Sequence, residues 1–206
     1  MLLKTALWLA CLAPLAHLVY RGLTVGLGAN PIEYITLDTG TWTLNLILAT
    51  LCITPLRRAS GRNWLVKLRR PIGLFAFFYG CLHFTTYIWL DKFFDIHDMI
   101  KDVAKRPFIT AGFFAFVLMI PLAATSTAAA VRRMGGRNWQ WLHRLIYVTG
   151  ASAVVHFWWK VKADHRNPAI YGTILIALLL ARLYRRRPPA PSPAGNVGAA
   201  CGRPGG

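Results

Sequence analysis

Six stretches of mostly apolar residues run along the chain, separated by short segments that carry most of the charged side chains. They cover residues 5–22, 41–56, 71–90, 107–124, 139–159 and 169–184. A helix needs about 20 such residues to cross a hydrocarbon core of about 30 Å. Backbone in lipid must pair within helices or closed barrels, and nothing here alternates with period 2. We therefore predict an all-α membrane bundle of about six transmembrane helices.

The ends of the chain and its connections set the predicted domain boundaries. Lys4 before an apolar run resembles a signal peptide, but the run is long for one and Pro14 suits a cleavage site poorly, so we predict a helix. Residues 188–206 are mainly Pro, Gly, Ala and Ser, which predicts a disordered tail after a single membrane domain at 1–187. The longest outer connection has about 16 residues, too few for a soluble catalytic domain.

Charge changes this picture only by adding an orientation. The chain is 55% hydrophobic and 15% charged, whereas a soluble domain carries about 25% charged residues. Its net charge of +17 raises the question of nucleic acid. With the amino terminus inside, however, the inner segments hold 16 of the 24 cations and none of the seven acids. This is the positive-inside pattern, so we predict a plasma-membrane protein with both termini cytoplasmic and no nucleic-acid partner.

Three histidines lie inside predicted helices: His83 in the third, and His143 and His156 in the fifth. An ionisable side chain at membrane depth is a functional candidate, and neutral imidazole is a common axial ligand of haem iron. At 1.5 Å per residue, His83 lies about 19 Å and His156 about 22 Å from the inner ends of their helices. The two are thus nearly level, which predicts that they clamp one haem iron. The alternative is an interhelical hydrogen bond.

His143 lies about 20 Å below His156 on the same helix, near the inner face. That separation suits a second redox centre, which would need a ligand other than histidine. Thirteen residues leave the two histidines about 140° apart around an ideal helix. Either a bend or π-bulge near Gly150 narrows this angle, or the two histidines face different neighbours.

Small residues and arginines accompany the histidines, and each set has two interpretations. Small side chains either leave a slot for a flat porphyrin or simply let helices approach closely; beside a histidine, we favour the slot. Inner arginines either orient the helices or pair with haem propionates or a flavin phosphate. The small residues are Gly73, Ala76 and Gly80 before His83, Thr149, Ser152 and Ala153 around His156, and Gly150 beside His143; the arginines are Arg69, Arg70 and Arg144.

Several segments resemble the MsrQ (YedZ) family, the haem-binding membrane subunit of a bacterial methionine-sulfoxide reductase system. They are residues 69–74 followed by His83, 105–112, 125–127, and 138–147 leading to 156–160. The resemblance covers about residues 41–184 and implies a ferric reductase-like domain in the bacterial inner membrane. It also implies one or two b-type haems associated with His83, His143 and His156, and FMN, although no motif marks a flavin or quinone site.

The resemblance further implies the electron path. Electrons would come from the quinone pool or a cytoplasmic flavin reductase and pass to a periplasmic molybdopterin-containing reductase subunit, MsrP, which repairs oxidised proteins. We therefore predict a redox subunit of an oxidoreductase complex rather than a self-sufficient enzyme, with membrane lipid around it. Two alternatives remain: a stand-alone ferric or quinone reductase, and a non-redox transporter or assembly protein whose histidines only join helices.

Overall fold

The computed structural model describes residues 2–183, and these contain helices and turns but no strand. The all-α prediction is confirmed. The predicted tail at 188–206 lies outside the described residues. The elements in chain order are α1 (Leu2–Thr24), α2 (Pro31–Ser60), the 3-10 turn η1 (Asn63–Leu65), α3 (Val66–Thr85), the π-helical η2 (Thr86–Asp91), α4 (Ile96–Lys105), α5 (Pro107–Ala124), α6 (Ala128–Met134), α7 (Gly136–Leu142), α8 (Leu145–Lys160) and α9 (Arg166–Leu183).

Helix α2 begins ten residues before the apolar stretch that predicted it, because its start is specified by capping rather than by hydrophobicity. The Asn30 side chain accepts a hydrogen bond from the Glu33 backbone N–H, and Pro31 occupies the first turn. At the other end Gly61 adopts φ 69°, and its N–H donates to the Arg57 carbonyl. The extra turns carry Thr36 and Gly40 into the bundle.

The fifth apolar stretch forms two helices, and the break lies at His143–Arg144 rather than near Gly150. The first of these helices, α7, is held against the end of α5 by Trp139, whose Nε1 donates to the Thr125 carbonyl over 2.8 Å. Gly150 lies inside the continuous helix α8, where an added Cβ would meet Leu175 and Leu51 at 3.4 and 3.5 Å. Its small size therefore serves close helix packing.

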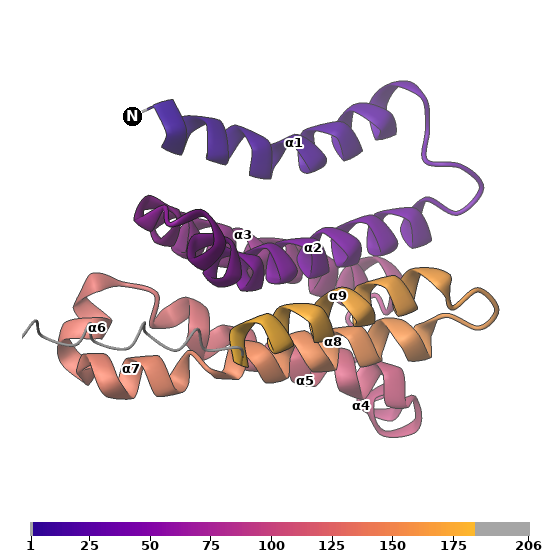
Figure 1. The fold of residues 1–206 in the computed structure, drawn as a ribbon. Coiled ribbons are helices and arrows are strands. Elements are labelled where there is room, and N and C mark those ends of the chain that lie inside the picture. Colours follow the sequence, from indigo (N-terminus) through magenta and orange to yellow (C-terminus); the bar gives the residue numbers. More distant parts are fainter. Residues whose placement is uncertain (1, 184–206) are drawn as a thin grey trace, which may run out of the picture.

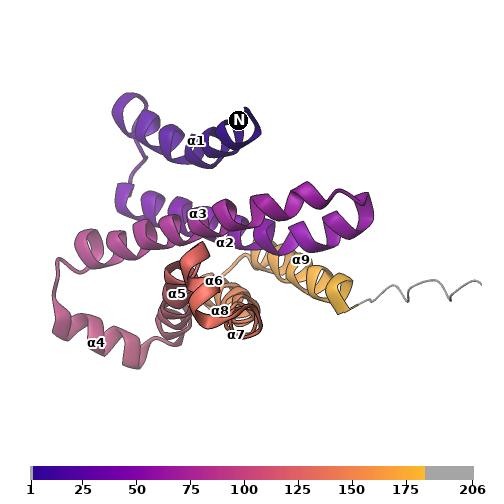
Figure 2. The same ribbon diagram turned by 90° about the vertical axis from the view of Figure 1, so that its left-hand side faces the viewer.

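The bundle is built from two tightly packed helix pairs, α2 with α3 and α5 with α8, and α9 lies along α8 and α2. Figures 1 and 2 show α1 at the margin, beside α2. Its anchor is Tyr79 of α3, which is fully buried. The Tyr79 hydroxyl accepts from the Leu15 N–H (3.1 Å) and donates to the Cys11 carbonyl (2.9 Å), on either side of Pro14.

Four helical segments among the described residues are long and apolar enough to cross a membrane: Leu3–Thr24, Pro31–Ser60, Asn63–Asp91 and Pro107–Ala124. The remaining two predicted spans correspond to α8, with 16 residues, and α9, with an arginine at each end. In Figure 1 the start of α1 and the end of α9 lie on the side of α6 and α7, while α4 and the α8–α9 connection lie on the opposite side. This arrangement agrees with the prediction that both ends of the membrane domain lie on one side.

Arg182 near the end of α9 ties three helices together. Pro55 has no N–H, so the carbonyl of Leu51, four residues earlier in α2, lacks its helical partner. Arg182 supplies two donors instead, with Nη2 at 2.7 Å and Nε at 3.2 Å from that oxygen. Its Nη1 donates to the Tyr147 hydroxyl of α8 over 2.7 Å. A guanidinium thus satisfies a backbone group that lipid could not.

Candidate functional site

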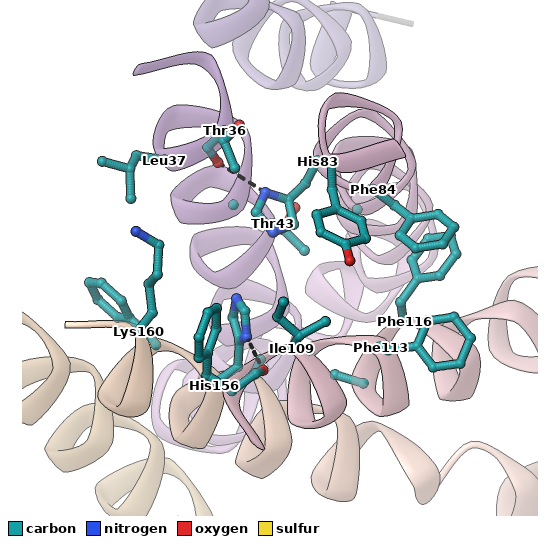
Figure 3. A pocket seen from close by; sticks show the side chains of 18 of the residues that line it. Thr36, Leu37, Thr43, His83, Phe84, Ile109, Phe113, Phe116, His156 and Lys160 are labelled. Atoms are coloured by element: carbon teal, nitrogen blue, oxygen red, sulfur yellow. Dashed lines mark hydrogen bonds between the residues drawn. The ribbon is translucent and has the colours of Figure 1, made fainter. Parts of the chain in front are cut away.

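A cavity of about 1240 Å³ lies between α2, α3, α5 and α8, and α4 contributes part of its wall. Ligand sites in proteins commonly occupy about 300–1000 Å³, so this space suits a large ligand. Figure 3 shows His83 and His156 reaching into it from different helices, with Lys160 on one side and Phe84, Phe113 and Phe116 on another. Both histidines of the predicted level pair line this one cavity.

The two imidazoles lie close together, with ring centres 6.1 Å apart and planes inclined at 75°. Two imidazoles on opposite sides of one metal ion, each bound at about 2 Å, would have ring centres about 6 Å apart. His83 and His156 therefore lie side by side, and at this separation both would be able to hold one metal-centred group.

Each imidazole uses its Nδ1 atom toward a backbone carbonyl. His83 Nδ1 is 2.9 Å from the Thr36 oxygen of α2, and His156 Nδ1 is 2.6 Å from the Phe108 oxygen of α5. A carbonyl only accepts, so both Nδ1 atoms carry the proton. Neither Nε2 atom has a hydrogen-bond partner among residues 2–183, and a deprotonated Nε2 is the form that binds a metal.

The cavity walls are small on some sides and aromatic on another. A Cβ added at Gly112 would lie 2.7 Å from His156 Nδ1, and one at Gly40 would lie 3.0 Å from His83 Nδ1. The Phe84 ring stacks on Phe116 at 4.6 Å between centres. Of the predicted small residues, Gly80 and Ala153 line the cavity. The others do not, and Gly73 instead faces Thr50 in the α2–α3 contact.

Three cationic side chains line the outer part of the cavity, although the sequence pattern placed these residues in loops. Arg106, Lys160 and Lys162 line it, and Lys160 Nζ lies 4.0 Å from Glu33 Oε1. Lys160 follows His156 by four residues and so lies on the same helix face, which is the signal that could have identified it. Arg70 and Arg144, the predicted cofactor-binding arginines, are exposed and lie outside this cavity lining.

His143 lies apart from this cavity, at the junction of α7 and α8. The Thr125 hydroxyl donates to the Pro121 carbonyl (2.6 Å) and therefore accepts from His143 Nε2 at 3.0 Å. The Trp139 ring stacks on His143 with centres 4.0 Å apart. The structure thus brings together His83 and His156 but places His143 in a separate polar cluster, facing different neighbours.

Ion pairs hold α4 against the end of η2. Lys92 Nζ lies 2.6 Å from Asp98 Oδ2 and 2.5 Å from Asp102 Oδ2, and Arg106 Nε lies 3.3 Å from Asp102 Oδ1. The hydrogen bonds that Lys92 donates to Asp102 and Asp98 hold the pKa of Lys92 above its ordinary value of 10.5. The hydrogen bond from Lys92 holds the pKa of Asp98 below 3.8. These outer acids therefore have partners within the chain.

The attachment of α4 is expected to depend on pH at both extremes. A carboxyl with a lowered pKa stabilises the fold fully above 3.8, and the contribution is lost as pH falls through the lowered value. A lysine with a raised pKa contributes fully below 10.5, and this is lost as pH rises through the raised value. The mobility of a spin label at Ile96→Cys, in a cysteine-free background, should stay low between these limits and rise outside them. A Lys92→Met variant should be mobile throughout; a pH profile identical to that of the parent would contradict the assignment.

The fold and the paired-histidine cavity define a class, the transmembrane components of redox systems. Residues 39–155 match the family described as ferric reductase like transmembrane component. The heme-binding subunit MsrQ of protein-methionine-sulfoxide reductase from Herminiimonas arsenicoxydans is 58% identical over 89% of this chain and 85% of that protein. Subunits of the same name from Ralstonia nicotianae and Bordetella pertussis are 54% and 51% identical, over 88% and 90% of this chain and 84% and 92% of their own lengths.

This chain therefore belongs to the MsrQ family of ferric reductase-like transmembrane proteins. The resemblance seen in the sequence motifs is confirmed. No solved structure matches the chain.

Proposed function

We propose that this protein is a transmembrane electron-transfer subunit that holds a b-type haem between His83 and His156. The observation that carries the proposal is the pair of imidazoles in the large cavity, 6.1 Å apart with both Nδ1 atoms engaged by backbone carbonyls. Related proteins of this family are named heme-binding subunits. Bound haem would supply one-electron chemistry at a potential that the surrounding protein tunes.

The residues of the cavity fit such a group. The two Nε2 atoms lack partners among the described residues, which leaves them available to bind iron. Gly40 and Gly112 pack directly against the imidazole rings. A Cβ at either position would lie 3.0 Å or less from a ring atom. Phe84 and Phe116 offer apolar surface to a macrocycle. In this proposal Arg106 and Lys160 pair with propionate groups at the outer part of the cavity.

The proposed path runs from the inner to the outer face. Reducing equivalents from the quinone pool or a cytoplasmic flavin reductase enter near His143, where Arg70 and Arg144 hold an anionic cofactor group such as that of FMN or a second haem. They pass to the haem between His83 and His156, and then to a docked periplasmic molybdopterin-containing subunit, MsrP, that reduces methionine sulfoxide in oxidised proteins. The chain sits in the bacterial inner membrane with both termini cytoplasmic. The distribution of charge supports this orientation. The inner segments contain arginines and no carboxylate, whereas all seven acids fall in the outer segments.

The test follows haem oxidation in the detergent-purified protein. After reduction and removal of the reductant, we expect the Soret and α bands to return to their oxidised positions on addition of MsrP with methionine sulfoxide. Either component alone should leave them reduced. A purified protein without a Soret band, despite ample haem supply, would contradict the haem proposal.

The same sample separates the proposed function from a stand-alone reductase. Soluble Fe(III), added without MsrP, should oxidise the haem more slowly than the complete partner system, because the proposed acceptor is a docked protein. Equal or faster oxidation by Fe(III) alone would assign the chain to small-molecule reduction instead.

A further inference from the structure

The same backbone arrangement occurs at both histidines, on helices that are far apart in the sequence. His83 of α3 bonds the carbonyl of Thr36 in α2, and the residue four positions later is Gly40. His156 of α8 bonds the carbonyl of Phe108 in α5, and the residue four positions later is Gly112. In each case the imidazole of one helix lies over the i and i+4 positions of its packed partner.

Helix geometry explains why glycine stands at these two positions. A carbonyl within a helix accepts the N–H four residues later and has a second lone pair for another donor. The side chain at i+4 leans toward the helix start and covers that second lone pair. At Gly112 a Cβ would come within 2.7, 2.9 and 3.1 Å of three His156 ring atoms, and at Gly40 within 3.0 Å of two His83 ring atoms. A larger residue at Gly112 would force the ring or the helix to move, and one at Gly40 would press on the ring.

We propose that Gly40 and Gly112 are positioning residues that keep the Thr36 and Phe108 carbonyls open to the imidazole Nδ1–H groups, and so set the basicity and ring orientation of both iron ligands. This inference rests on the proposed haem site. A hydrogen bond from Nδ1–H to a carbonyl fixes the tautomer and raises the basicity of Nε2. A more basic ligand favours the ferric form, which lowers the midpoint potential of the haem.

The two sites are not equally tight, and this predicts an order of effects. At Gly112 a Cβ would overlap the ring, so either the ring or the helix must move. At Gly40 the distance from a Cβ to the His83 ring would be only a few tenths of an ångström shorter than an ordinary van der Waals contact. Gly73 of α3 is a matched control, since its Cβ would meet only Thr50, at 3.9 Å, outside the cavity.

The experiment compares Gly112→Ala, Gly40→Ala and Gly73→Ala with the wild type by potentiometric titration and by EPR of the ferric low-spin haem. We expect a higher midpoint potential and altered g values in Gly112→Ala, a smaller change of the same sign in Gly40→Ala, and wild-type values in Gly73→Ala. Wild-type potential and g values in both Gly112→Ala and Gly40→Ala would overturn the inference, while leaving the haem site itself intact.

A variant that fails to retain haem calls for a measurement on the wild type. Proton ENDOR on the ferric protein, before and after brief transfer to deuterium oxide, should detect two ring Nδ1 protons that exchange slowly. Ring protons that exchange at once would show that water, rather than the Thr36 and Phe108 carbonyls, accepts from them, and would overturn the inference. A wild type without low-spin haem would instead overturn the proposed function.

Discussion

His83→Ala and His156→Ala are each expected to abolish the low-spin haem signal of the purified protein. The cavity offers one imidazole on each side, and the rings are 6.1 Å apart, so no other described histidine can replace a lost ligand. Loss of outer partners alone weakens metal sites about 10- to 100-fold, and loss of a ligand should do at least as much. We therefore expect haem affinity to fall at least about tenfold, which should lower the haem content measured by the Soret band and by pyridine haemochrome quantification.

His143→Ala is the matched control in the same series. Its Nε2 bonds Thr125 and its ring lies outside the cavity, so the low-spin signal of the His83–His156 centre should persist. A second haem at the inner face would appear as a drop in haem content in this variant alone. Wild-type spectrum and stoichiometry in His83→Ala or His156→Ala would show that the pair does not bind the haem.

Arg182→Ala is expected to lower the free energy of unfolding in detergent by about 3 kcal/mol, since a charged hydrogen bond contributes about 1.5–3 kcal/mol and a stranded buried acceptor costs a similar amount. The Leu51 carbonyl would lose both of its donors, and Pro55 prevents a helical replacement. Leu51 is fully buried, so water cannot reach this oxygen readily. Thermal unfolding followed by circular dichroism would measure the loss.

Two further variants identify the cause of that loss. Arg182→Lys keeps the charge but not the forked donors, so its stability should fall between those of wild type and Arg182→Ala. Arg58→Ala removes an exposed bond to the Arg182 carbonyl at the same end of the bundle and should cost under about 1 kcal/mol. Equal stability of Arg182→Ala and Arg58→Ala would mean that Arg182 contributes no more than surface charge.

Hydropathy predicted where helices exist more reliably than where they begin. The stretch at 107–124 coincides with α5, because Pro107 starts the helix and apolar residues fill it. The stretch at 41–56 missed ten residues of α2, because Glu33 and Asp38 end the apolar run while the Asn30 cap and Pro31 start the helix. Those missed turns contain Thr36 and Gly40, so a search for apolar runs could not find the residues of α2 that contact His83.

The histidine pair was predictable because depth in a membrane helix follows directly from residue count. The partners of the pair were not. Arg106 and Lys160 belong by sequence to loop ends, where charge ordinarily means solvation, and only the packing of α5 and α8 places them beside the cavity. The break at His143–Arg144 likewise depends on Thr125 and Trp139, which are brought together by a turn whose geometry no periodicity encodes.

The sequence by itself determined that this protein is a helical membrane bundle, and it predicted the side on which the acids lie and which two imidazoles come together, because hydrophobic length, charge and helical rise are local properties of the chain. Only the tertiary structure decided that those imidazoles face one cavity, that each lies against a carbonyl followed four residues later by a glycine, and that Arg182 donates to the Leu51 carbonyl that Pro55 leaves without a helical partner. These features depend on which faces of distant helices pack together, and packing is set by the fit of all side chains at once rather than by any single stretch.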